Sequence, residues 1–193
     1  MMTLVLCALL TMPMWAGKTE KEWNFTLNEE AECILEYDIP TNKDAKAAIT
    51  ALKSTLNRQT FEERSVISEE GGTIVYQITK NTKTRYNPFA GNFNESMKFK
   101  MEIRYENGTI KLRISDLVLI NTYEGFGKKT TSDTFSGKIS TYEEYQEALN
   151  SGSLKGKEKK EAESKMEEIS DSLNECQLEM DKLISAITKG INK

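Results

Sequence analysis

Side chains able to perform chemistry are sparse in this sequence. Its 193 residues include no histidine, the commonest general base and metal ligand, so a nucleophilic site would need an unusual base that no motif marks. Gly125–Lys128 lacks the spacing of a phosphate-binding loop. Glu124 and Asp133 look like ordinary acids rather than a carboxylate pair across a cleft, and no cluster has metal-site spacing. We therefore expect a protein that is not an enzyme and uses no cofactor or metal.

The N-terminal residues indicate where the protein goes. Residues 4–14 form an apolar run of signal-peptide length, and Ala16 and Gly17 precede a charged stretch that begins at Lys18. The run is too short to span a bilayer, and no other segment is apolar enough to do so. Although basic residues do not precede the run, we expect residues 1–17 to be a signal peptide. The location is then periplasmic, in the cell envelope or secreted. A buried N-terminal helix is the alternative.

Export would leave two cysteines in the mature chain, because Cys7 is removed with the signal peptide. Cys33 and Cys176 both lie on apolar faces of predicted elements, and an exported compartment permits their oxidation. A disulfide requires Cα atoms within roughly 7 Å, and cysteine is also common as a plain core residue. Two buried free thiols are the favoured interpretation, and a Cys33–Cys176 bridge is the alternative.

The secondary structure that positions these residues is clearest between Met97 and Ile120. Apolar and polar residues alternate on both sides of Asn107-Gly108, a dipeptide typical of a type I′ turn between antiparallel strands. A two-residue turn places Tyr105 opposite Ile110, and each following apolar pair lands on the same face of the sheet. Pattern and turn therefore predict one hairpin in one register.

Asp116 interrupts this alternation, since it falls on the apolar side of the second strand. A β-bulge at this position would turn the carboxylate outward and bend the strand. The alternative is a paired, partly buried carboxylate. We favour the bulge, because an unpaired buried charge is costly.

The remaining pattern predicts further elements around the hairpin. Strands are expected at 31–39, 61–69 and 73–80, and helices at 41–58, 141–149 and 157–190. Residues 18–30 form a polar lead-in in which Trp23, Phe25 and Leu27 alternate. The chain from 31 to 193 is thus expected to be a single α+β domain with an antiparallel sheet of about five strands.

The apolar residues of the segment 157–190 recur at alternating spacings of three and four. Heptad spacing is compatible with a coiled-coil dimer. A single amphipathic helix that follows a complete sheet is better explained as the cover of that sheet's apolar face. We favour a monomer of this kind and keep coiled-coil self-assembly as the alternative.

The segments 81–95 and 121–139 are predicted to be long loops that leave the same end of the sheet and lie side by side. Loops on a rigid sheet often carry binding residues, and aromatic and arginine side chains are enriched at interfaces. The alternative is that the aromatic residues fold inward and plug the open end of the sheet. The candidate binding residues are Arg85, Tyr86, Phe89, Phe93, Tyr123 and Phe126.

The order of predicted elements resembles an exported Bacteroidetes family, a domain of unknown function with a fold similar to TATA-box-binding protein. The likeness is carried by residues 97–119, MKFKMEIRYENGTIKLRISDLVL, and by the terminal amphipathic helix. It covers roughly residues 31–191. The resemblance implies a curved antiparallel sheet that grips a long helix. It supplies no catalytic or binding residues.

Taken together, the sequence favours an exported, non-catalytic binding or scaffold domain. Its partner would be an envelope or extracellular protein, glycan or small molecule. Nucleic acid is not expected, because the net charge is −4 and the basic face of the hairpin carries no aromatic residue. The rival functions are self-assembly through the terminal helix and an enzyme of unrecognised type.

Overall fold

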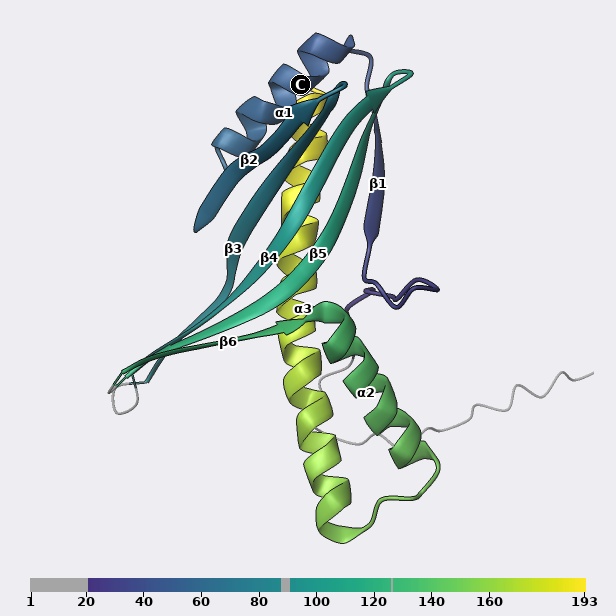
Figure 1. Cartoon of the computed structure of the whole chain (residues 1–193), viewed down its shortest axis with the longest axis vertical. Coiled ribbons are helices and arrows are strands. Elements are labelled where there is room, and N and C mark those ends of the chain that lie inside the picture. Colours follow the sequence, from purple (N-terminus) through teal and green to yellow (C-terminus); the bar gives the residue numbers. More distant parts are fainter. Residues whose placement is uncertain (1–20, 88–90, 126) are drawn as a thin grey trace, which may run out of the picture.

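The computed structural model describes residues 21–87, 91–125 and 127–193. The predicted signal peptide, Phe89 and Phe126 therefore lie outside the described residues. In chain order the elements are β1 (Leu35–Pro40), α1 (Ala45–Asn57), β2 (Glu63–Glu70), β3 (Thr73–Asn87), β4 (Gly91–Glu106), β5 (Thr109–Glu124), β6 (Lys128–Thr134), α2 (Phe135–Asn150) and α3 (Gly156–Ile191) (Figure 1).

The strands form one antiparallel sheet in the order β1-β5-β4-β3-β2, with β6 paired to the far part of β5. The helix α3 runs along one face of this sheet and then continues past it, where α2 lies beside it (Figure 1). This is the α+β, helix-gripping fold that the sequence predicts. The sheet has six strands rather than about five, because β6 lies in a segment predicted as loop.

The central hairpin has the predicted register. Tyr105 lies opposite Ile110, and the ladder continues to Met101 opposite Ile114. Asn107 and Gly108 have φ angles of 48° and 81°, the positive values that a type I′ turn requires at both central positions. The alternating apolar residues of this hairpin are buried, apart from Tyr105, which is half-buried. The core-facing side is therefore the one that the pattern indicates.

The predicted β-bulge at Asp116 is confirmed. The β4–β5 register shifts between Lys98 and Lys100, and Asp116 has a φ of 52°. Its carboxylate points outward, where it is 58% exposed and lies 2.6 Å from the Lys100 ammonium group. The bulge thus removes a charge from the apolar face of the sheet.

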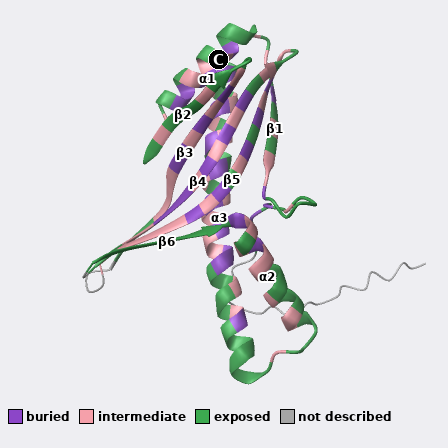
Figure 2. Cartoon of the chain, viewed as in Figure 1, coloured by how far each residue is buried: buried purple, intermediate pink, exposed green. Residues whose placement is uncertain are grey.

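The predictions of loops at 81–95 and 121–139 are wrong. Most of these residues belong to β3, β4, β5 and β6, which continue the hairpin ladder. We call this part of the sheet the arm: residues 81–87, 91–96, 118–124 and 128–134. Its polar residues do not alternate with apolar ones, because most of the arm extends away from the core (Figure 2). The strand structure of the arm is therefore held by pairing between neighbouring strands rather than by burial of side chains.

Two helix starts also differ from the sequence expectation. The helix predicted from Thr141 begins earlier, at Phe135, and Thr134 caps it by accepting a hydrogen bond from the Gly137 N–H at 3.1 Å. The helix predicted from residue 41 begins after Asp44, which accepts from the Ala47 N–H. Asp and Thr are both common N-cap residues. Other residues of the same types lie close by in the sequence, so residue type alone does not identify which one caps the helix.

The core lies between the sheet and α3. The α3 residues on the predicted stripe are buried except Met166, which is half-buried. This confirms that the helix covers the sheet rather than presenting a free coiled-coil seam. At its end, Gly190 approaches Thr55 of α1 so closely that a side chain at 190 would collide with it. The buried stripe includes Ile169, Leu173, Cys176, Met180, Leu183 and Ile187.

The lead-in segment contributes more to the core than its polar composition suggests. Trp23 and Phe25 are each 1% exposed. Phe25 packs edge-to-face on Phe135 of α2 with ring centroids 5.0 Å apart, and Trp23 packs in the same way on Tyr142 at 5.4 Å. The segment joins α2 to the middle of α3, where the Glu22 and Asn24 N–H groups donate to Asn174 and Gln177.

Leu173→Ala should destabilise the protein by about 2–5 kcal/mol, because it opens a cavity at a fully buried position. Leu178 lies on the same helix but is 49% exposed, so Leu178→Ala should change the free energy of unfolding by less than about 0.5 kcal/mol. Urea unfolding of both variants measures the difference. Equal, small effects would show that the α3 stripe is not the core.

Cys33 and Cys176 are free and buried. Burial raises the pKa of the Cys33 thiol to about 11. Burial, and then the nearby Glu95 carboxylate, raise the pKa of the Cys176 thiol. Because the thiolate is the reactive form, neither should react with a disulfide reagent at about pH 8 in the native state. Both thiols should react after denaturation without reductant, and peptide mass spectrometry measures this. If Cys33 and Cys176 both stay unmodified after denaturation, they form a disulfide.

Candidate binding site

The arm presents two cross-strand rows of side chains toward α3. Residues directly opposite one another in an antiparallel ladder project from the same face, so the register defines each row. The outer row, further from the core, contains Arg85, Phe93, Tyr123 and Lys129. The inner row contains Lys83, Glu95, Asn121 and Thr131.

The structure divides the sequence-predicted binding residues between the two faces of the arm. Arg85, Phe93 and Tyr123 share the outer row that faces α3. Tyr86 belongs to the opposite face, in the row of Asn92, and is 74% exposed. The prediction that the two segments lie side by side is confirmed, although they do so as strands. A binding role for these side chains is taken up below as a proposal.

A cleft of about 570 Å³ separates the arm from α3 and the start of α2. Basic and uncharged side chains come mainly from the arm, whereas the α3 wall is acidic. In the ribbon view the arm diverges from α3 (Figure 1). The lining residues are Lys83, Arg85, Phe93, Glu95, Asn121, Thr131, Lys138, Ser164, Glu167, Glu168, Asp171 and Ser172.

Ion pairs close the end of the cleft nearest the core. Lys80 lies 3.0 Å from Glu179, and Lys83 lies 3.4 Å from Glu175. Burial raises the pKa of the Glu179 carboxyl, but hydrogen bonds from Lys182 and Lys80 outweigh this effect and leave it below its ordinary value. These two ion pairs join β3 to α3 between the core and the start of the cleft.

The series of ion pairs stops where the arm leaves the helix. Apart from Glu168, which pairs with Lys165, the next charged side chains along the two walls are Arg85 of β3 and Asp171 and Glu167 of α3. Within the described part of the chain, none of these three side chains has an ion-pair partner. The cleft therefore has one unpaired cation on its arm wall and two unpaired acids on its helix wall.

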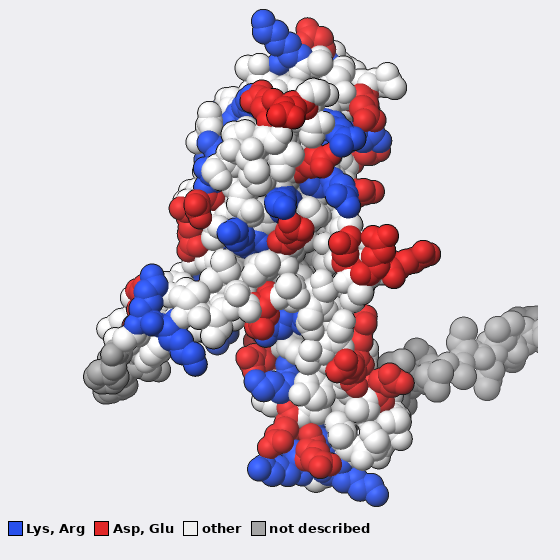
Figure 3. Space-filling view, in the orientation of Figure 1, with Lys and Arg blue, Asp and Glu red and all other residues white. Residues whose placement is uncertain are grey.

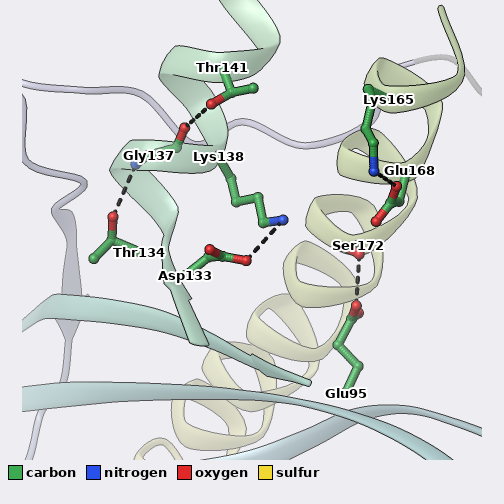
Figure 4. Close-up of polar contacts among 9 residues, drawn as sticks. All are labelled: Glu95, Asp133, Thr134, Gly137, Lys138, Thr141, Lys165, Glu168 and Ser172. Carbon is green, nitrogen blue, oxygen red and sulfur yellow. Dashed lines mark hydrogen bonds and ion pairs between the residues drawn. The ribbon is translucent and has the colours of Figure 1, made fainter. Parts of the chain in front are cut away.

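Glu95 lies at the base of the cleft and is 3% exposed. Its carboxylate accepts a hydrogen bond from the Ser172 hydroxyl at 2.7 Å, and the Thr82 hydroxyl donates to its backbone oxygen at 3.0 Å (Figure 4). Among the described residues, no cation lies within ion-pair distance of this carboxylate. Beside it in the row, the amide oxygen of Asn121 is buried and lacks a described partner. A buried carboxylate held only by hydroxyl groups is costly to maintain.

Sequence reasoning missed Glu95, Asn121 and Ser172. Glu95 does carry a signal, because it has the same strand parity as Met97 and so must face α3. An acid on the apolar side of a strand is the anomaly noted at Asp116, but here no bulge turns it outward. Ser172 carries no such signal, because a serine one position from an apolar stripe is ordinary.

The outward face of the hairpin does not form a basic stripe. Lys100, Lys111 and Arg113 lie near Asp116, Asp38 and Glu36 respectively. Figure 3 shows acidic and basic side chains interspersed over the visible face of the sheet. In residues 21–87, 91–125 and 127–193, no three His, Cys, Asp or Glu side chains gather as a metal site. No helix in these ranges is long and apolar enough to cross a membrane.

Two solved structures are similar to this chain. A TBP-like protein from Parabacteroides distasonis ATCC 8503 has a TM-score of 0.50 and 14% sequence identity, with 83% of this chain and 95% of that chain covered. A DUF4468 family protein from Bacteroides ovatus ATCC 8483 has a TM-score of 0.41 and 10% identity, with 83% and 88% covered. Neither a family model nor a curated protein matches the sequence. The first likeness confirms the TBP-like fold, and identity this low supports the fold alone.

A double-mutant cycle tests the hydrogen bond between the Ser172 hydroxyl and the Glu95 carboxylate. Ser172→Ala should cost about 1.5–3 kcal/mol, because it removes a hydrogen-bond donor from a buried carboxylate. In a Glu95→Gln background the same change should cost only about 0.5–1.5 kcal/mol, the range for a neutral hydrogen bond. Glu95→Gln alone should not destabilise the protein. Urea unfolding gives all four values, and equal costs in both backgrounds would contradict this account.

Proposed function

We propose that this protein is an exported, non-catalytic binding domain that takes a small polar ligand in the cleft between the arm and α3. The observation that carries this proposal is the Glu95 carboxylate, buried at the base of the cleft without a counter-charge. Buried polar groups left short of partners are kept where they serve a function, since they reduce stability. A ligand would supply the missing donors.

The lining residues indicate the chemistry of this ligand. The unpaired acids Glu167 and Asp171 are able to accept hydrogen bonds from a ligand, as are Glu95 and the Asn121 amide oxygen. Arg85 on the opposite wall offers donors to an oxygen or an anionic group. A molecule rich in hydrogen-bond donors and bearing some acceptors fits both walls. Hydroxyl groups of a saccharide and ammonium groups of a small amine share this donor chemistry.

The binding interpretation is better supported than self-assembly through α3. The apolar stripe of α3 is already buried inside the chain, so a coiled coil would require the sheet to release it. Phe93 and Tyr123 share one row of the arm and are half-buried, and Phe93 lines the cleft. The plug and binding alternatives therefore combine, because a ring that supports the arm also forms part of the cleft wall. Export rests on the apolar N-terminal sequence.

Thermal unfolding with panels of soluble saccharides and small amines tests the proposal. A ligand at ten times its Kd stabilises the native state by about 1.4 kcal/mol, which raises Tm by about 3–6 °C for a chain of this size. The Arg85→Gln variant should lose most of that shift. The two panels distinguish hydroxyl from ammonium recognition.

Arg104→Gln is the matched control, because Arg104 is 54% exposed and is bound to Glu102 outside the cleft. It should keep the full ligand-induced shift. A ligand that stabilises wild-type protein and Arg85→Gln equally would place binding elsewhere. Chemical turnover of the ligand would overturn the non-catalytic part of the proposal.

A further inference from the structure

The free edges of the sheet differ in how they are protected. Exposed edge strands tend to pair with other chains unless a bulge, proline or charge prevents it. On β2 the register breaks between Val66 and Ser68, and three glutamates flank this irregularity. β6 has no such break: it pairs with β5 without interruption from Thr134 to Lys128, contains no proline, and all seven of its residues are exposed.

We propose that β6 pairs with β6 of a second copy of this chain, antiparallel, about a two-fold axis at Thr131. Opposite residues of an antiparallel ladder project from the same face, and side chains alternate along a strand. A two-fold edge pair must therefore be centred on a residue rather than between two residues. This requirement leaves few registers for a strand of seven residues.

Charge selects the register centred on Thr131. In that register Lys129 of each copy lies opposite Asp133 of the other, and Lys128 lies opposite Thr134. All seven residues are then paired, with two oppositely charged cross-strand pairs. Centres at Thr130 or Ser132 place no lysine of β6 opposite Asp133, and each leaves two residues at one end of β6 unpaired. The sequence of β6 is thus self-complementary only about its own midpoint.

The pairing would also join the two clefts, a consequence that rests on the proposed function. The inner row of the arm ends at Thr131 on β6. Across the two-fold axis it would continue into Thr131 and Asn121 of the second copy, on the same face of the sheet. The two arms would then form one sheet, with both ligand sites along a single trough. The pairing itself does not depend on a ligand.

Sedimentation equilibrium of the full chain tests the pairing. A seven-residue edge buries little surface, so measurements should extend to about 1 mM, where weak interfaces are populated. Wild-type protein should dimerise. Lys129→Asp and Asp133→Lys should each weaken dimerisation at least tenfold, because each places like charges opposite one another twice. The double variant restores opposite charges and should recover dimerisation.

Two controls keep the result specific. Asp133 also forms an ion pair with Lys138 at 3.1 Å, so Lys138→Gln removes this contact without altering the proposed interface and should leave the dimer intact. The Lys129 side chain has no hydrogen-bond or ion-pair partner within the described residues. Lys129→Asp should therefore keep the native circular dichroism, and its effect on dimerisation tests the proposal without the other variants. A wild-type monomer throughout the concentration range would overturn the proposal, as would dimerisation unchanged by Lys129→Asp. Loss of ligand binding by a still-dimeric Arg85→Gln variant would leave the pairing supported.

Discussion

The arrangement of this protein depends on one geometric constraint: a twisted sheet and a straight helix stay in contact over only part of their length. β4 and β5 each have 16 residues and α3 has 36, so all three elements are about 50 Å long. Since strands in a sheet twist, the sheet lies on α3 near the hairpin turn and then diverges from it as the arm (Figure 1). The cleft is the space that this divergence opens.

The side chains change character along the line of divergence. Near the hairpin the helix and sheet exclude water, and the contact is made by apolar residues such as Leu183 and Met101. Where the two begin to separate, longer side chains maintain contact as ion pairs between β3 and α3. Beyond Lys83 the separation is too large for such pairs, and charged groups of both signs face the cleft unpaired. The unpaired charges thus lie at the open end of the cleft, away from the apolar core.

The far half of α3 needs separate support, because the sheet no longer covers it. The helix α2 lies beside this half (Figure 1), and the lead-in segment packs on α2 through Trp23 and Phe25. The same segment is bound to the middle of α3, where the Glu22 and Asn24 N–H groups donate to Asn174 and Gln177. One wall of the cleft is therefore a helix that α2 and the lead-in segment hold in place. The other wall is a four-stranded arm joined to the body by its own ladders. Ligand binding and edge pairing, as proposed, use the α3-facing side and the free edge of the same arm.

The sequence by itself determined the hairpin register, the bulge at Asp116 and the buried stripe of α3. Each is a local property: a two-residue turn fixes which residues lie opposite, and periodicity fixes which face is apolar. Tertiary structure alone decided that 81–87 and 128–134 are strands, because each pairs with the neighbouring strand beyond the edge of the core, where neither burial nor an apolar alternation marks it. It also decided that Glu95 lies buried beside Ser172. Parity sets the face on which Glu95 lies, but how closely α3 approaches that face depends on the twist accumulated along the whole sheet.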